Sequence, residues 1–122
     1  MALHHELPIY KASYDLFGLA FDVVRNLPRD LKRHLGDEVL GGCTQMVVLV
    51  FRANIAREKV PHIEELLERV EVVNLLLRVL VEKHFISREQ YAGAIKLTSS
   101  IGKQAGGWKK ASAASPAPRS PR

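Results

Sequence analysis

The most continuous hydrophobic stretch of the chain is residues 70–81, VEVVNLLLRVLV, in which nine of twelve residues are apolar. A surface helix needs an apolar stripe only about 100° wide, whereas this stretch is apolar nearly all round. As a helix it must be covered by its own bundle core and, on another side, by a second chain or a well-wrapped position within this one. The stretch is shorter than the roughly 20 apolar residues of a membrane span. The pattern therefore predicts a helical protein that oligomerises through its middle helices.

Helical periodicity also precedes this stretch. Residues 8–26 are predicted to form a first helix, because apolar side chains recur there at alternating spacings of four and three. The positions are Tyr10, Tyr14, Phe17, Phe21 and Val24. After the break at Leu27-Pro28, a second helix is predicted from Arg29 to Ala56. Its run MVVLVF at residues 46–51 would alone fit a strand, but helical patterning on both sides favours a helix buried all round.

Two further helices complete the pattern. The third is predicted to begin near Pro61 and to end near Phe85. Ser87 and Gln90 then form a capping-box sequence, which predicts the start of a fourth helix. Four long helices with short breaks predict an all-α, antiparallel up-down-up-down four-helix bundle over residues 8–110. Residues 1–7 are interpreted as an N-terminal arm, and the Pro/Ser-rich basic residues 111–122 as a disordered tail.

Composition narrows the functional classes. At 122 residues the chain fits one domain. A single cysteine, Cys43, cannot form an internal disulfide, and no signal-peptide pattern opens the chain, so a cytoplasmic protein without a membrane segment is expected. The net charge of +5 is unevenly distributed, since residues 86–122 hold seven basic side chains against Glu89 alone. Such asymmetry indicates a polyanionic or acidic partner.

Lysines in the predicted fourth helix place part of this positive charge on one helix face. Lys96, Lys103 and Lys110 recur every seven residues, which places them in one stripe, and Lys109 extends it. Cations in a row along one helix face can follow a phosphate backbone, so these residues are candidate RNA and DNA ligands. The alternative is a solvated lysine face.

A second basic cluster opens the second helix. Arg29, Lys32 and Arg33 lie where the helix dipole disfavours cations, so they do not serve to stabilise that helix end. They are further candidate nucleic-acid ligands. Asp30, Asp37 and Glu38 partly neutralise the cluster, so a surface salt-bridge network is an equal alternative.

Two polar residues interrupt the most hydrophobic stretch. Arg78 is expected at a subunit rim, paired with Glu82 one turn later, or directed at a partner. Asn74, one turn earlier, can specify the register of helix packing. Structural roles are the default for both, and both are candidate partner contacts.

Catalytic signals are weak. The histidines are scattered without metal-ligand spacing, no glycine-rich phosphate loop follows a strand, and Cys43 lies on an apolar face, so neither a metal site nor a cofactor is predicted. Arg29 with His34 fits R-x4-H, and Arg78 with His84 fits R-x5-H, patterns similar to those of HEPN-type ribonucleases. Residues five apart on a helix point about 140° from each other, so such catalysis needs groups from a second subunit.

Three segments carry a resemblance to a known family. They are residues 27–36, LPRDLKRHLG; the end of the third helix with the following turn, LRVL and FISREQY; and residues 101–110, IGKQAGGWKK. Together they resemble the four-helix-bundle family of 23S rRNA intervening-sequence proteins. The chain is most similar to the accessory variability determinant (Avd) proteins of diversity-generating retroelements. The IG-[KR]-x-x-GGW ending is the most specific segment, and the likeness covers about residues 8–110.

This resemblance implies a homopentameric barrel that binds nucleic acid and the element's reverse transcriptase, and supports adenine-mutagenic cDNA synthesis without catalytic activity of its own. It implies that Arg78 contacts the partner and that Lys103 is the basic residue of the last motif. Asn74 stands where some relatives carry a second arginine. The alternatives are an intervening-sequence protein that acts as an oligomeric scaffold without a retroelement, and a HEPN-like ribonuclease.

Overall fold

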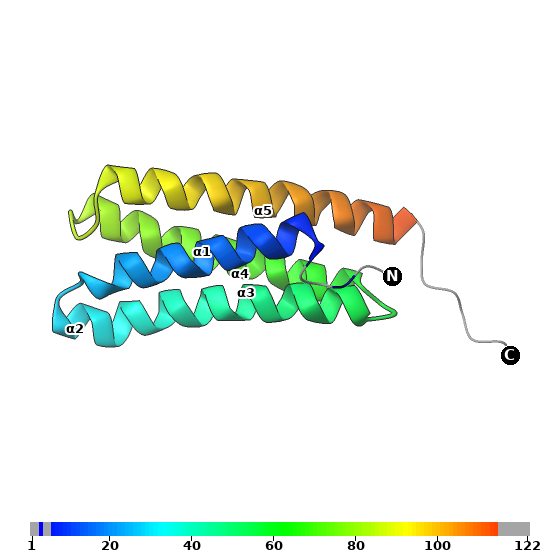
Figure 1. The fold of residues 1–122 in the computed structure, drawn as a ribbon, viewed down its shortest axis with the longest axis horizontal. Coiled ribbons are helices and arrows are strands. Elements are labelled where there is room, and N and C mark those ends of the chain that lie inside the picture. Colours follow the sequence, from blue (N-terminus) through cyan, green and yellow to red (C-terminus); the bar gives the residue numbers. More distant parts are fainter. Residues whose placement is uncertain (1–2, 4–5, 115–122) are drawn as a thin grey trace, which may run out of the picture.

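The structure is a computed structural model that describes Leu3 and residues 6–114, and this part of the chain contains four long helices and no strand (Figure 1). The predicted all-α four-helix bundle is confirmed. The long helices are α1 (Pro8–Arg25), α3 (Asp37–Ile55), α4 (Val60–Glu82) and α5 (Arg88–Ala114). A short helix α2 (Arg29–Leu31) and a π-helical turn η2 (Lys32–Gly36) lead directly into α3.

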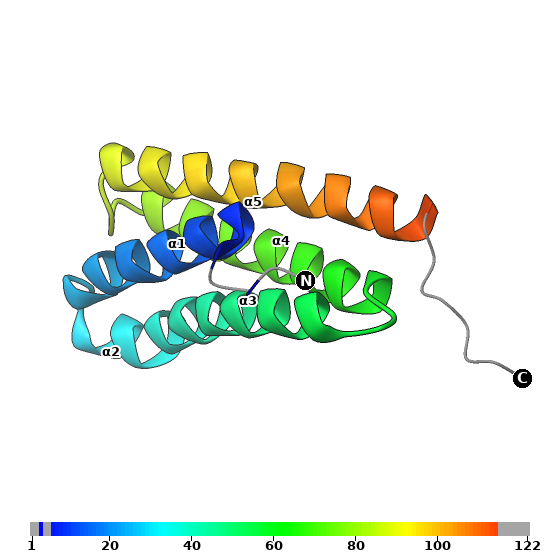
Figure 2. The same ribbon diagram turned by 45° about the vertical axis from the view of Figure 1, so that its right-hand side comes forward.

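The four long helices form a closed ring of neighbours. α3 packs on α1 and α4, and α5 packs on the other sides of α1 and α4, so α3 and α5 lie diagonally, as do α1 and α4. The turns between α1 and α2 and between α4 and α5 lie at one end of the bundle, and the α3–α4 turn lies at the other (Figures 1 and 2). This arrangement decides which surface residues can meet.

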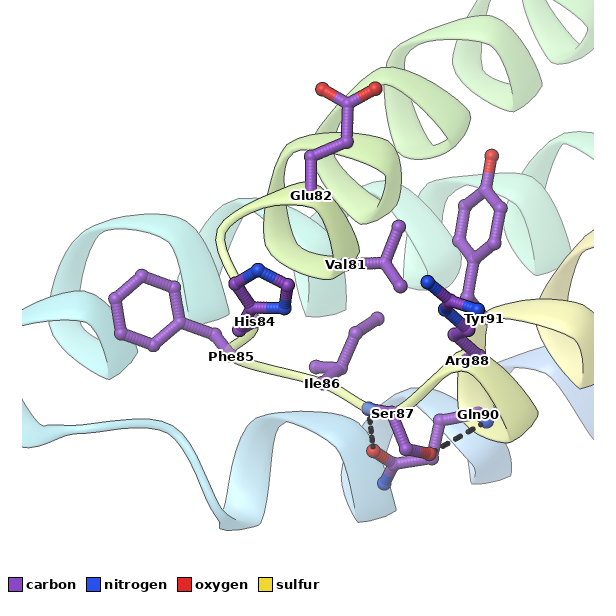
Figure 3. Close-up of a pocket in the computed structure, with 9 residues that line it drawn as sticks. All are labelled: Val81, Glu82, His84, Phe85, Ile86, Ser87, Arg88, Gln90 and Tyr91. Carbon is purple, nitrogen blue, oxygen red and sulfur yellow. Dashed lines mark hydrogen bonds between the residues drawn. The ribbon is translucent and has the colours of Figure 1, made fainter.

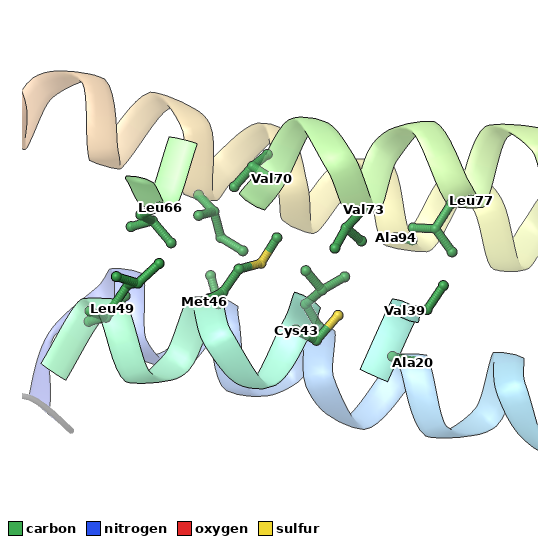
Figure 4. Close-up of a cluster of buried hydrophobic side chains, with 14 of the residues drawn as sticks. Ala20, Val39, Cys43, Met46, Leu49, Leu66, Val70, Val73, Leu77 and Ala94 are labelled. Atoms are coloured by element: carbon green, nitrogen blue, oxygen red, sulfur yellow. The ribbon is translucent and has the colours of Figure 1, made fainter. Parts of the chain in front are cut away.

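The core follows the predicted face of α4. Its buried side chains occur at spacings of three and four, and they are Ile63, Leu66, Val70, Val73, Leu77 and Leu80. Cys43 and Met46 of α3 face them across the bundle (Figure 4). Burial raises the pKa of the Cys43 thiol to about 12, so at neutral pH the group is a protonated core side chain and not a nucleophile.

The aromatic side chains of α1 do not form the face that this helix buries in the core. Tyr10 stacks on Tyr14 and Phe17 packs on Phe21, so these rings do line one side of the helix. However, Tyr14 is 59% exposed and Phe21 is 51% exposed. The core face of α1 is instead formed mainly by smaller or aliphatic residues, namely Ile9, Ala12, Ser13, Leu16, Ala20, Val23 and Val24.

The second predicted helix, Arg29–Ala56, is continuous in the structure but includes the π-helical turn. That turn ends at Gly36, where α1 comes very close: a Cβ atom at this position would lie 2.8 Å from Cγ1 of Val24. A glycine is therefore needed where the wider turn meets α1. The predicted segment was correct, and its local geometry was not visible in the pattern.

Helix ends match the sequence signals with two differences. The capping box forms as predicted, because the Ser87 N–H donates to Gln90 Oε1 and the Gln90 N–H donates to Ser87 Oγ, both at 3.0 Å. α4 ends at Glu82 instead of near Phe85. α5 continues beyond Lys110 to Ala114, as alanine favours a helix, so the start of the proposed tail is helical. Residues 1–2, 4–5 and 115–122 of the proposed arm and tail lie outside the described residues.

Lys59 caps the end of α3. Its ammonium donates to the carbonyl oxygens of Ala53, Asn54 and Ala56 at 3.0, 2.8 and 3.0 Å. All three donors of the side chain are thus used on carbonyl groups that a helix C-terminus leaves without partners.

Replacing Lys59 by Met is expected to lower the free energy of unfolding by about 1–3 kcal/mol, because three charge-assisted hydrogen bonds and a favourable dipole contact are lost. The measurement is urea unfolding followed by circular dichroism at one fixed protein concentration. Lys103→Met, at an exposed position without a hydrogen bond among the described residues, is the matched control. Equal midpoints for the two variants would contradict the capping role.

Candidate nucleic-acid and partner interface

The lysine stripe predicted for the fourth helix is present on α5. Lys96, Lys103 and Lys110 are all exposed and recur every seven residues. None of the three has an ion pair within the described part of the chain, and Glu89 in the first turn is the only acidic residue of α5. The outer face of α5 thus presents uncompensated positive charge.

Lys109 does not extend this stripe. Its Nζ atom lies 3.2 Å from Oε2 of Glu64 on α4, so the side chain is turned toward the neighbouring helix and is only partly exposed. A lysine in such a pair has less free charge to offer a phosphate group. The main contact of Lys109 in the structure is therefore its ion pair with α4.

Glycines leave the surface around the lysines open. A Cβ atom added at Gly102, Gly106 or Gly107 would meet no atom within 4 Å, apart from the helix's own nearby backbone. Each glycine costs roughly 0.5–1 kcal/mol relative to alanine in a helix. These residues keep the α5 backbone accessible, and no other helix among the described residues packs against it at these positions.

The second basic cluster lies at the other end of the bundle from Lys110. Arg29, Lys32 and Arg33 are exposed on α2 and η2, which continue into α3 (Figure 1). Among the described residues they have no ion pair, so the salt-bridge alternative is not observed. Because α3 and α5 are diagonal, the cluster and the lysine stripe belong to different sides of one bundle.

Arg78 is paired as the sequence suggested. Its Nε atom donates to Oε2 of Glu82 at 3.0 Å. The hydrogen bond and charge of Glu82, followed by the influence of Tyr91, raise the pKa of Arg78. The side chain is 69% exposed, so this pair adds little stability and leaves the guanidinium accessible.

Asn74 has a buried side-chain oxygen that accepts no hydrogen bond among the described residues. The residue is half-buried, and its Oδ1 atom is buried without a hydrogen-bond partner in the described chain. An unpaired buried acceptor costs about 1–3 kcal/mol. A register-specifying hydrogen bond from Asn74 is thus not formed within one subunit.

Apolar side chains on the outside of the bundle were partly anticipated. Val72, Leu75 and Val79 of the stretch 70–81 are exposed, Leu75 by 61%. The described residues of one chain do not cover this face, so the well-wrapped alternative is not observed among them. Sequence reasoning missed the exposure of Tyr14 and Phe21 on α1, because their spacing also fits a core face.

Sequence reasoning also missed a pocket at the α4–α5 turn. The turn residue Phe85 and the α5 residues Arg88 and Tyr91 are among those that line it (Figure 3). Its sequence signal was the stretch FISREQY, which was used to recognise a helix start and the family resemblance but not a pocket.

The ribonuclease pattern is not assembled within one chain. In the described structure neither His34 nor His84 forms a hydrogen bond or ion pair with its predicted arginine partner, and Arg78 is engaged by Glu82. His84 has a φ of 65° and lies in the turn that follows α4. Among the described residues there is no group of three or more His, Cys, Asp or Glu side chains suited to a metal, and no helix there is long and apolar enough to cross a membrane.

Comparison with known proteins agrees with the resemblance noted in the sequence. A family model described as bAvd-like matches residues 7–112, which include the bundle except for the last two residues of α5. No curated protein and no solved structure matches the chain. The matched segment covers both basic clusters, Arg78 and the glycine-rich end of α5. On this evidence the chain belongs to the bAvd-like family.

Proposed function

We propose that this chain is the accessory protein of a diversity-generating retroelement, which binds nucleic acid and the element's reverse transcriptase and so supports mutagenic cDNA synthesis. It has no catalytic activity of its own and works in the cytoplasm. Membership of the bAvd-like family supports the accessory role. The observation that carries the proposal is the uncompensated lysine stripe Lys96, Lys103 and Lys110 on α5.

The stripe suits a phosphate backbone for a physical reason. Successive lysines are seven residues, or about 10 Å, apart along the helix axis. Each lysine that neutralises a phosphate releases a condensed counterion, which favours binding and makes it salt-dependent. Contacts to phosphate groups carry no sequence information, so a stripe that follows the backbone would bind RNA and DNA without choosing a sequence. Arg29, Lys32 and Arg33 provide a second contact area at the far end of the bundle.

The double variant Lys96→Ala/Lys103→Ala is expected to bind a labelled RNA–DNA duplex about 5- to 30-fold more weakly. The slope of log affinity against log salt should become shallower by about 0.9 per lost contact. Fluorescence anisotropy at several salt concentrations measures both quantities.

Lys11→Ala/Arg25→Ala is the charge-matched control, because these side chains are paired with Asp15 and Asp22 on α1. Equal losses in the two double variants would mean that only net charge matters, and would remove α5 from the binding site.

Assembly into a ring is the second part of the proposal. Val72, Leu75 and Val79 form an exposed aliphatic face on α4, and Tyr14 and Phe21 belong to an aromatic face on α1. Because α1 and α4 lie diagonally in the bundle, these faces cannot cover each other within one chain. We propose that the aromatic face of one subunit packs on the aliphatic face of the next. Repetition of such a head-to-tail contact closes into a ring, and the family resemblance favours five subunits.

Mixing two interface variants tests this contact. Tyr14→Glu/Phe21→Glu should lack the aromatic face, and Leu75→Glu/Val79→Glu should lack the aliphatic face, so each is expected to be monomeric by light scattering. Mixed together they should form a one-to-one dimer, because each retains the face that the other needs. Homodimers of either variant alone would contradict a head-to-tail contact.

Arg78 is the proposed contact for the reverse transcriptase. Arg78→Glu is expected to abolish co-purification with the reverse transcriptase while leaving the melting temperature within about 5 °C, because an ion pair between exposed side chains adds little stability. Arg25→Glu, at another exposed and paired arginine, is the control. If Arg78→Glu unfolds the protein, the arginine is structural.

The intervening-sequence scaffold remains the other outcome. A chain that forms the ring but binds neither duplex nor reverse transcriptase would be a protein-binding scaffold. In that case the lysine stripe is a solvated face.

A further inference from the structure

Gly18 weakens α1 for no reason that its own subunit provides. It lies within the helix and is exposed, and a Cβ atom added there would meet no described atom within 4 Å, apart from the helix's own nearby backbone. Gly36 and Gly42 differ, because a neighbouring valine approaches each of them closely. A glycine inside a helix is less favourable than an alanine. Gly18 is therefore a cost that no close contact among the described residues offsets.

Three aromatic residues surround Gly18 on the surface of α1. Together with the glycine they occupy positions i, i+3, i+4 and i+7, namely Tyr14, Phe17, Gly18 and Phe21. Four neighbouring positions of this kind form the hole that receives a side chain in knobs-into-holes helix packing. Tyr14 and Phe21 are exposed, and the Phe17 ring packs on that of Phe21 with 5.1 Å between the ring centres. We call these four residues the Gly18 hole, because its one open position is the glycine.

Leu75 is the most exposed large apolar side chain of α4. It is 61% exposed, whereas Val72 and Val79 are each 38% exposed. These valines lie three residues before and four residues after Leu75, so they flank it on the same helix face. A long side chain between two shorter and less exposed ones has the shape of a knob that enters a hole on a facing helix.

Two close glycine contacts place Gly18 and the middle of α4 at the same height along the bundle. Gly36, where α3 is about to begin, meets Val24 of α1. Since α1 and α3 are antiparallel, six residues onward to Gly42 correspond to six residues back to Gly18. Gly42 in turn meets Val73 of α4. Gly18 and Val73 are therefore about level, although they lie on helices at opposite corners of the bundle.

A ring of subunits brings equal heights of α1 and α4 together. The two helices run in the same direction, because both end at the same end of the bundle (Figures 1 and 2). A cyclic rotation moves a subunit without shifting it along the ring axis. In a ring whose bundles stand along that axis, each level of α1 thus meets the same level of α4 in the next subunit. Leu75 lies two residues, or about 3 Å, beyond Val73, so it arrives at the Gly18 hole.

We propose that Leu75 of one subunit inserts into the Gly18 hole of the next subunit. The inference rests on the proposed head-to-tail ring and adds to it the register of the contact and the parallel orientation of the two helices. A second copy of this chain is the occupant, because knob and hole lie at matching heights, as cyclic symmetry requires. Gly18 is then a requirement of assembly, since a side chain at this position would take the space that Leu75 needs.

Filling the hole tests the inference. The two interface variants described above should associate through a single contact, because one keeps the aromatic face and the other keeps the aliphatic face. Gly18→Leu in the variant with the aromatic face should weaken this association about 5- to 150-fold by isothermal titration calorimetry, because it overpacks the hole. It should also raise the melting temperature of that subunit alone by about 2–6 °C, because leucine favours a helix more than glycine does. Gly18→Ala should raise the melting temperature similarly and weaken the association less.

A control and a rescue make the test specific. Gly106→Leu is the matched control, because Gly106 is also exposed within a helix, with no described atom near an added Cβ, but lies on α5. It should leave the association within about twofold. Leu75→Ala in the variant with the aliphatic face removes the knob and should weaken the association by itself. Combined with Gly18→Leu it makes room for the new leucine, so this pair should bind at least about fivefold more tightly than the pair with Gly18→Leu alone.

The outcomes separate this inference from the proposed ring. If the two interface variants do not associate at all, both are overturned. If they associate and both Gly18 substitutions leave the affinity within about twofold, the Leu75 contact is overturned and the ring stands with another register. The same conclusion follows if the combined pair binds more weakly than either single substitution. A melting temperature lowered by both Gly18 substitutions would show that the glycine serves the isolated helix, and would overturn the inference as well.

Discussion

The close approach of α3 and α4 at Gly42 sets the spacing on which the bundle depends. A Cβ atom at this position would lie 2.7 Å from Cγ2 of Val73, which is closer than real Cβ contacts allow. Gly36 plays the same part against Val24 of α1. With α3 held between its two neighbours in this way, Met46 and Leu49 are excluded from water. Dense packing of this kind makes interiors sensitive to the addition of a single methyl group.

Close packing inside the bundle leaves chemically distinct surfaces outside. α1 and α4 expose apolar side chains, and α5 exposes lysines and glycines. Exposed apolar residues such as Tyr14 and Leu75 do not stabilise the isolated subunit, and exposed glycines such as Gly106 weaken its longest helix. These features are costs for one chain, and each is offset only if a second molecule covers it. The proposed ring and nucleic-acid contacts assign the aromatic, aliphatic and basic surfaces to different molecules.

The helix ends at the α4–α5 turn both satisfy backbone hydrogen bonds and shape the surface of the bundle. The Schellman motif at His84 and the capping box at Ser87 satisfy backbone groups that would otherwise need water. The same geometry turns Ile86 inward and Phe85 outward, so the turn that stabilises two helices also builds a pocket. A non-glycine residue with positive φ is uncommon outside such turns, and histidine is among the residues that tolerate it.

Local signals were enough to predict the elements. Hydrophobic periodicity, Pro8 and Pro61 near helix starts, and the Ser87 capping box act within a few residues, so the four helices could be placed from sequence. The pair of Arg78 and Glu82 was predictable for the same reason, because residues four apart on a helix are neighbours. The family likeness was also accessible, since it depends on short segments such as IGKQAGGW.

Features that depend on two distant segments were not predictable. The sequence alone determined the all-α bundle, its helix boundaries to within a few residues, and the lysine stripe, because these follow from the helical repeat of 3.6 residues and from local start and stop signals. Only the tertiary structure decided that Tyr14 and Phe21 face outward and that Lys109 turns toward Glu64. The physical reason is that exposure and side-chain contact depend on which helices become neighbours, and periodicity within one helix does not contain that information.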